Sequence, residues 1–80
     1  MNIAAIVLAS AAMCANIADT DQRAYCRATT DHQPAYCSSI SDYSLRQRCY
    51  VAAGEDSSRC NTISDASQRT LCRADSHPHP

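Results

Sequence analysis

The sequence predicts an all-α fold of three short, disulfide-stapled helical hairpins in a 23-residue tandem repeat. Three observations lead to this prediction. The frame Cys-x2-Ile-x-Asp-x3-Arg-x2-Cys occurs at a constant spacing in residues 14–26, 37–49 and 60–72. Every copy places an Asp where a helix would begin, and two cysteines bracket every copy. No segment alternates apolar and polar residues as a half-buried strand would.

Composition narrows the possible functions. The 80-residue chain has no Trp and no Phe, so its core should be thin and should need covalent staples. The formal net charge is −1, which gives no electrostatic reason to expect nucleic acid as a partner. Nothing in the sequence indicates a cofactor. Six cysteines in so short a chain are typical of an oxidising compartment, and we expect a periplasmic or secreted protein.

The two ends flank a predicted repeat domain over residues 14–74. Residues 1–13 are apolar, and the small residues 9–11 would suit cleavage of a secretory signal peptide. No Lys or Arg precedes this run, so a retained N-terminal helix is the alternative, and the chain would touch a membrane only through it. A lipoprotein with Cys14 acylated fits less well, because Cys14 keeps the register of the repeat. Residues 75–80 are predicted to form a disordered tail.

Each unit should contain two helical pieces. The first carries the leading Cys and, three residues later, the Ile, a spacing that places both on one helix face. The second follows the Asp and is expected over residues 20–28, 43–53 and 66–74. Pro34 suits the first turn of a helix and Gly54 suits the position after a helix end, so both mark breaks between units.

The Asp and the Arg of the frame are interpreted as structural. They stand four residues apart, which on a helix favours an ion pair worth about 0.2–0.5 kcal/mol. The Asp would also cap the second helix and meet the positive end of its dipole. The frame offers no nucleophile or base beside them, so we expect no enzymatic activity. The predicted cap and ion-pair residues are Asp19 with Arg23, Asp42 with Arg46, and Asp65 with Arg69.

The cysteines permit two regular pairing schemes. One joins the cysteines of each motif, as Cys14–Cys26, Cys37–Cys49 and Cys60–Cys72. The other joins neighbouring motifs, as Cys26–Cys37 and Cys49–Cys60, and leaves Cys14 and Cys72 at opposite ends. The presence of three complete motifs favours the first scheme. Each bridge would then close a loop of about a dozen residues and stabilise the fold by roughly 3 kcal/mol.

Two other uses of the cysteines remain as alternatives. A metal-binding module usually has close ligand pairs such as Cys-x2-Cys, and this chain has none. Its one close pair of histidines, His77 and His79, lies in the predicted tail. A thiol-redox protein would need one distinctive cysteine of low pKa, whereas the repeat makes three equivalent pairs.

A surface for a partner is expected on the middle unit. Partly buried tyrosines combine apolar contact with a hydrogen-bonding tip, which suits protein interfaces, although they would also fill gaps in a thin core. The candidate surface consists of Tyr36, Tyr43, Arg48 and Tyr50. Another protein is therefore the expected partner.

Over residues 14–74 the repeat resembles a class of small bacterial proteins that carry tandem Cys-x2-Ile-x-Asp-x3-Arg-x2-Cys motifs, often after an export signal. The resemblance implies a repeat fold and export, and it assigns no activity and no functional residue. The sequence as a whole predicts a non-enzymatic binding or structural protein of the cell envelope, or of an extracellular or viral assembly. An inhibitor or immunity-type protein against a secreted effector is the main alternative.

Overall fold

The structure, a computed structural model, describes residues 14–76. Its elements are α2 (Thr20–Asp31), the 3-10 helix η1 (Pro34–Ser39), α3 (Tyr43–Ala52), the 3-10 helix η2 (Ser57–Thr62) and α4 (Ala66–Asp75). No strand occurs within this range, and the predicted all-α fold is confirmed. The predicted N-terminal segment and residues 77–80 lie outside the described residues.

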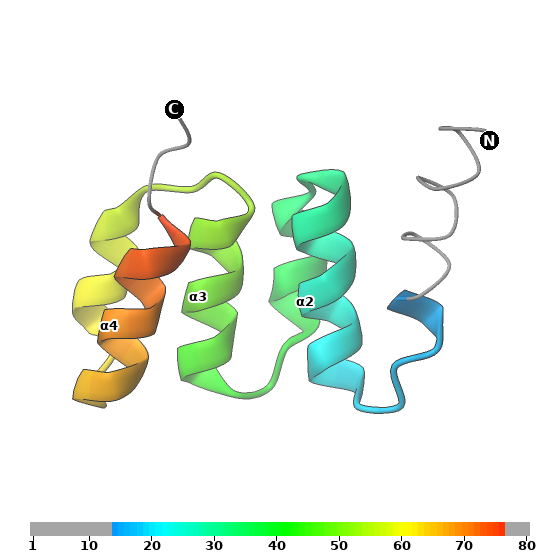
Figure 1. Ribbon diagram of the computed structural model, residues 1–80, viewed down its shortest axis with the longest axis horizontal. Helices are drawn as coiled ribbons and strands as arrows, with labels where there is room; N and C mark the ends of the chain where they lie inside the picture. Colours follow the sequence, from blue (N-terminus) through cyan, green and yellow to red (C-terminus); the bar gives the residue numbers. More distant parts are fainter. Residues whose placement is uncertain (1–13, 77–80) are drawn as a thin grey trace, which may run out of the picture.

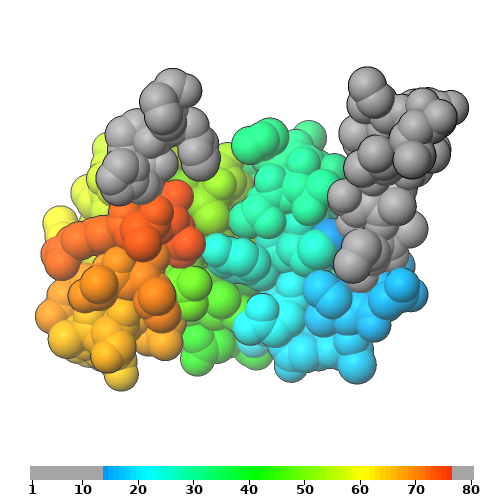
Figure 2. Space-filling view, in the orientation of Figure 1, coloured from blue at the N-terminus to red at the C-terminus, as the bar shows by residue number. Residues whose placement is uncertain are grey.

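The units form a linear array. Figure 1 shows α2, α3 and α4 side by side, with their N-terminal ends at the same edge of the molecule. Helix α2 packs against η1 and α3, and α3 packs in turn against η2 and α4. In Figure 2 the colours follow the sequence from one side of the molecule to the other, so consecutive units lie next to one another along the array. This is the architecture of a short solenoid.

The α-helices begin where the Asp caps predict, but their ends differ from the prediction by one to three residues. Helix α2 continues beyond residue 28 to Asp31, because no Gly or Pro interrupts it, and His32 then ends it in a left-handed conformation (φ 53°). Helix α3 is followed by Gly54 at φ +112°, as predicted. Asp75 is the last residue of α4 and Ser76 is its cap, so these two residues belong to the helix end and not to the predicted tail.

The first piece of the second and third units differs in kind from the predicted helix. Pro34 opens η1 as expected, but η1 is a 3-10 helix, and Ile40 lies just past its end. The backbone N–H of Ile40 donates to the carbonyl of Cys37 at 3.0 Å, and Ile63 repeats this bond with Cys60 at 3.1 Å. A bond between residues three apart places them on one side of the turn. Cys and Ile therefore share a buried side, as predicted, through a tighter turn.

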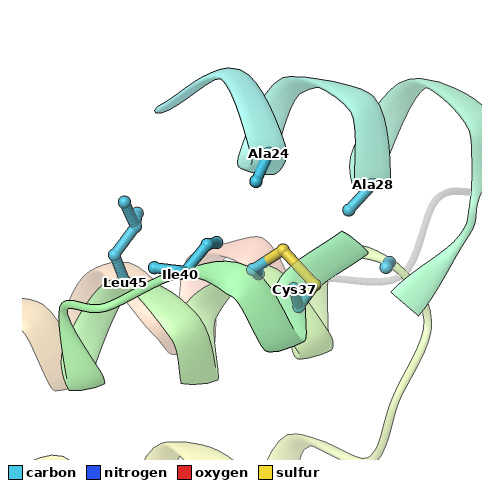
Figure 3. Packing of buried hydrophobic residues seen from close by; sticks show 7 residues of the cluster. Ala24, Ala28, Cys37, Ile40 and Leu45 are labelled. Carbon is cyan, nitrogen blue, oxygen red and sulfur yellow. A yellow bond between two sulfur atoms is a disulfide. The ribbon is translucent and has the colours of Figure 1, made fainter. Parts of the chain in front are cut away.

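The core lies at the junctions between units. The first junction buries Ala24 and Ala28 of α2 against Cys37, Ile40 and other residues of the middle unit. Figure 3 shows both alanines directed toward the disulfide of Cys37. Alanine is small enough to let α2 approach the disulfide closely, so sulfur fills the space that a large apolar side chain would otherwise take. The second junction buries Val51, Cys60, Ile63 and Cys72.

The disulfides follow the within-motif scheme, with Cα–Cα distances of 5.5–5.6 Å. Each bridge joins cysteines 12 residues apart, at the start of a unit and within its α-helix. Because the loops are equal and local, every unit is closed independently of the others. The three bridges are Cys14–Cys26, Cys37–Cys49 and Cys60–Cys72, and the predicted pairing is confirmed.

Candidate functional site

The aspartates of the frame are helix caps. Asp19 accepts a hydrogen bond from the backbone N–H of Gln22 at 2.8 Å. Asp42 accepts from Leu45 at 2.8 Å and Asp65 from Gln68 at 3.0 Å. Each carboxylate therefore satisfies an N–H at the start of a helix that has no partner within the helix. The predicted capping role is confirmed.

The predicted ion pair between this Asp and the Arg four residues later is wrong. Across residues 14–76 the ion pairs are Arg48–Asp75 and Arg59–Glu55, and neither joins a cap Asp to its Arg. The arginines instead reach the carbonyl of the Ile six residues earlier. The bonds run from Arg23 to Ile17 at 2.9 Å, from Arg46 to Ile40 at 2.8 Å and from Arg69 to Ile63 at 2.7 Å.

The reason lies in the turn that connects the two helical pieces. In the described residues no backbone N–H reaches the carbonyl of Ile40 or its equivalents, and a buried carbonyl without a partner is costly. The Asp carboxylate is already directed at the helix N-terminus. A long guanidinium can instead turn back over the loop and donate a charge-assisted bond to the Ile carbonyl. The Arg of the frame therefore fixes the turn.

This arrangement makes a prediction for Arg46 and Asp42. Arg46→Met should lower the free energy of unfolding by about 1–3 kcal/mol, because the Ile40 carbonyl loses its donor. Asp42→Asn should cost no more than a few tenths of a kcal/mol, because Asn is an equally good N-cap. Urea unfolding followed by circular dichroism measures both. Equal losses in the two variants would restore the ion-pair interpretation.

The three caps line one shallow groove. It has a volume of about 470 Å³ and runs along the edge where α2, α3 and α4 begin, with Asp21 and Arg48 among its lining residues. Asp21 joins the first unit to the second, because its carboxylate accepts bonds from the backbone N–H groups of Ser41 (3.0 Å) and Asp42 (3.1 Å) and from the Ser41 hydroxyl (3.0 Å). The groove carboxylates thus already serve the fold.

The contacts of Asp21 make the first junction sensitive to acid. The hydrogen bonds from the backbone of Ser41 and Asp42 hold the pKa of Asp21 below its ordinary value of 3.8. A carboxyl group with a depressed folded-state pKa stabilises the fold above its unfolded-state pKa. That contribution is lost as the pH falls through the folded-state pKa. Asp21→Asn should therefore flatten the acid side of the urea-midpoint profile, and an unchanged profile would contradict this role.

Arg48, predicted as part of the partner surface, instead connects all three units. Its guanidinium donates to the Asp75 carboxylate at 3.0 Å and to the Gln68 side chain at 3.2 Å, both on α4. It also lies 5.8 Å from the ring of Tyr25 on α2, whose hydroxyl donates to Asp75 at 3.3 Å. Burial, and next the charge of Asp75, raise the pKa of Tyr25 above its ordinary value of 10.0.

Three residues of this network, Tyr25, Gln68 and Asp75, were not predicted from the sequence. One signal was available, because Tyr25 and Arg48 occupy the same position of consecutive units, immediately before the second cysteine. Residues in the same position of stacked units are natural neighbours. No such signal was available for Asp75. It is the last residue of α4, whereas the sequence predicted a disordered tail from this residue onward.

The three tyrosines of the predicted surface lie in different settings. Tyr43 begins α3, is 45% exposed and lies 5.2 Å from the guanidinium of Arg46. Tyr50 packs against the first core cluster. Tyr36 lies on η1, is 41% exposed and borders two hollows. Tyr36 and Tyr43 are thus exposed, whereas Tyr50 and Arg48 serve the contacts between units, and the partner surface itself stays a prediction.

Among the residues that the structure describes, no group of three or more His, Cys, Asp or Glu side chains is placed to hold a metal ion. None of the helices in that range is both long and apolar enough to cross a membrane. Comparison of the chain with protein-family models, curated proteins and solved structures found no match.

Proposed function

We propose that this chain is a non-enzymatic protein-binding module of an oxidising, extracytoplasmic compartment, either periplasmic or secreted. The observation that supports this most strongly is the set of three local disulfides in an array with so small a core. Such bridges are typical of proteins that fold outside a reducing cytoplasm. They also hold the exposed side chains in fixed positions, which lowers the entropic cost of binding.

The compartment is tested by trapping thiols in producing cells. Acid quenching and alkylation preserve the redox state, and reduction should add two hydrogen atoms per bridge, about 6 Da for three bridges. The expected result is an unalkylated chain that gains this mass only after reduction. Six alkylated cysteines in the isolated protein would overturn the proposed compartment.

The binding role is tested with the oxidised chain as bait against the extracytoplasmic fraction. The expected result is saturable binding of a defined partner that is lost when the bait is reduced and alkylated. This control keeps the sequence while removing the bridges, so it separates a folded surface from adhesive side chains. Equal capture by both baits, or turnover of a substrate by the purified chain, would contradict the proposal.

A further inference from the structure

We propose that the cleft between α2 and η1 binds a carboxylate-bearing segment of a partner protein. This cleft, called here the first-junction cleft, contains Arg23, Arg27 and Tyr36. The proposal rests on the binding function above and specifies where the partner is held and which chemistry holds it. It differs from the surface expected from the sequence, because of that set only Tyr36 takes part.

The cleft consists of two adjoining hollows. The larger, of about 260 Å³, is lined by Thr20, Arg23, Ala24, Arg27, Tyr36 and Ser39. The smaller, of about 90 Å³, shares Arg27 and Tyr36 with it and also includes Asp31. The larger hollow therefore has two guanidinium groups and no carboxylate, although the chain as a whole carries a formal net charge of −1. An anionic group is the complement of this lining.

Arg27 is exposed and available to a ligand. Within residues 14–76 it is the one arginine that forms no hydrogen bond, ion pair or ring contact with another described residue. Arg23 uses one of its five N–H groups on the Ile17 carbonyl and has others left. Two guanidinium groups at one hollow suit a carboxylate, which can accept paired hydrogen bonds from each.

At the second junction, the residues equivalent to Arg27 and Tyr36 bind each other. There the Arg and the Tyr are exchanged, because Tyr50 takes the position of Arg27 and Arg59 that of Tyr36. These two stack, with the guanidinium 4.2 Å from the ring centroid. Arg59 also bonds Gln47 at 3.2 Å and pairs with Glu55 at 3.5 Å.

The two junctions also differ in the size of the side chains at equivalent positions. Thr20 and Ala24 border the first-junction cleft, whereas the larger Tyr43 and Gln47 occupy those positions in the next unit. The ring of Tyr43 lies 5.2 Å from the guanidinium of Arg46. The positions that border the first-junction cleft thus carry larger side chains in the next unit. The exposed ring of Tyr36 adds an apolar wall, which suits a segment with an apolar residue beside its acidic one.

The test uses the oxidised full chain and a hexapeptide of alternating glutamate and leucine, acetylated and amidated. Its matched control peptide has glutamine in place of glutamate. Binding is followed by ¹⁵N chemical shifts, including the arginine Nε–H groups. The expected result is a saturable shift confined to residues 20–27 and 36–39, with the Arg27 Nε–H among the signals that move. The glutamine peptide should bind at least about tenfold more weakly.

Three variants locate the site. Arg27→Gln should weaken binding of the glutamate peptide by about tenfold or more, because a charge-assisted bond is lost. Arg73→Gln is the matched control, since Arg73 occupies the same position of the third unit, where no cleft is described, and should leave affinity unchanged. Thr20→Tyr places at the cleft the larger side chain that Tyr43 provides at the equivalent position of the next unit, and should also abolish binding. Both target positions are exposed, so the fold is retained.

The outcomes are separable. Shifts elsewhere on the molecule, equal binding of the two peptides, or an Arg27→Gln variant with unchanged affinity would each overturn the first-junction cleft. If a partner captured by the oxidised bait binds the Arg27→Gln variant as tightly as the native chain, this inference is wrong and the proposed binding function stands. If no saturable partner is found, the proposed function fails, whatever the peptide does.

Discussion

Replacing Cys37 and Cys49 together by alanine is expected to lower the free energy of unfolding by about 3 kcal/mol. The bridge joins cysteines 12 residues apart. Its removal raises the conformational entropy of the unfolded chain, because the loop is no longer closed, and so favours unfolding. Both cysteines are fully buried, and Cys37 lies in the core cluster at the first junction. Urea unfolding of the protein with the other two bridges intact measures the effect.

The matching variant removes Cys60 and Cys72, whose bridge spans the same separation. If loop entropy dominates, the two double variants should lose similar amounts of stability. A change in the dependence of unfolding free energy on urea concentration would show that the unstapled unit unfolds separately. A loss below about 1 kcal/mol in both variants would contradict the role assigned to the bridges.

Ile40→Ala should lower the free energy of unfolding by about 2–5 kcal/mol. Ile40 is 1% exposed and packs where the middle unit meets α2, so its truncation leaves a cavity at the first junction. In so thin a core, few neighbouring side chains are large enough to collapse into that space. Thermal and urea unfolding both measure the loss.

Leu71→Ala provides the control for Ile40. Leu71 is the exposed large aliphatic residue of α4, with 45% of its surface accessible, and its truncation should change stability by less than about 0.5 kcal/mol. Equal losses in the two variants would mean that the junction is not the core. A larger loss in Leu71→Ala would place the stabilising contacts on the outer face of α4.

The features that could be predicted from the sequence are those decided within a few residues. The Asp caps, Pro34 at the start of η1 and Gly54 after α3 depend on backbone conformation at one position. The disulfide pairing was predictable because the spacing repeats. The fold class followed from these local features together.

The remaining features depend on choices that local sequence does not decide. The guanidinium of Arg46 can reach either the Asp42 carboxylate or the Ile40 carbonyl, and only the geometry of the turn selects the latter. Tyr25 and Asp75 are 50 residues apart and meet because the units stack. The first-junction cleft is lined by the small side chains of Thr20 and Ala24 and by Arg27, which has no partner among the described residues. This feature becomes clear only when the two junctions are compared.

The connectivity also affects how the bridges can form. Native partners are 12 residues apart, whereas Cys26 and Cys37 are separated by 11, so loop-closure entropy hardly distinguishes correct from incorrect pairing. Order of arrival would distinguish them in the proposed oxidising compartment, because a chain that enters from its N-terminus exposes Cys14 and Cys26 before Cys37. A chain oxidised from its N-terminus therefore pairs correctly in sequence. A fully reduced chain that is oxidised at once chooses among fifteen pairings.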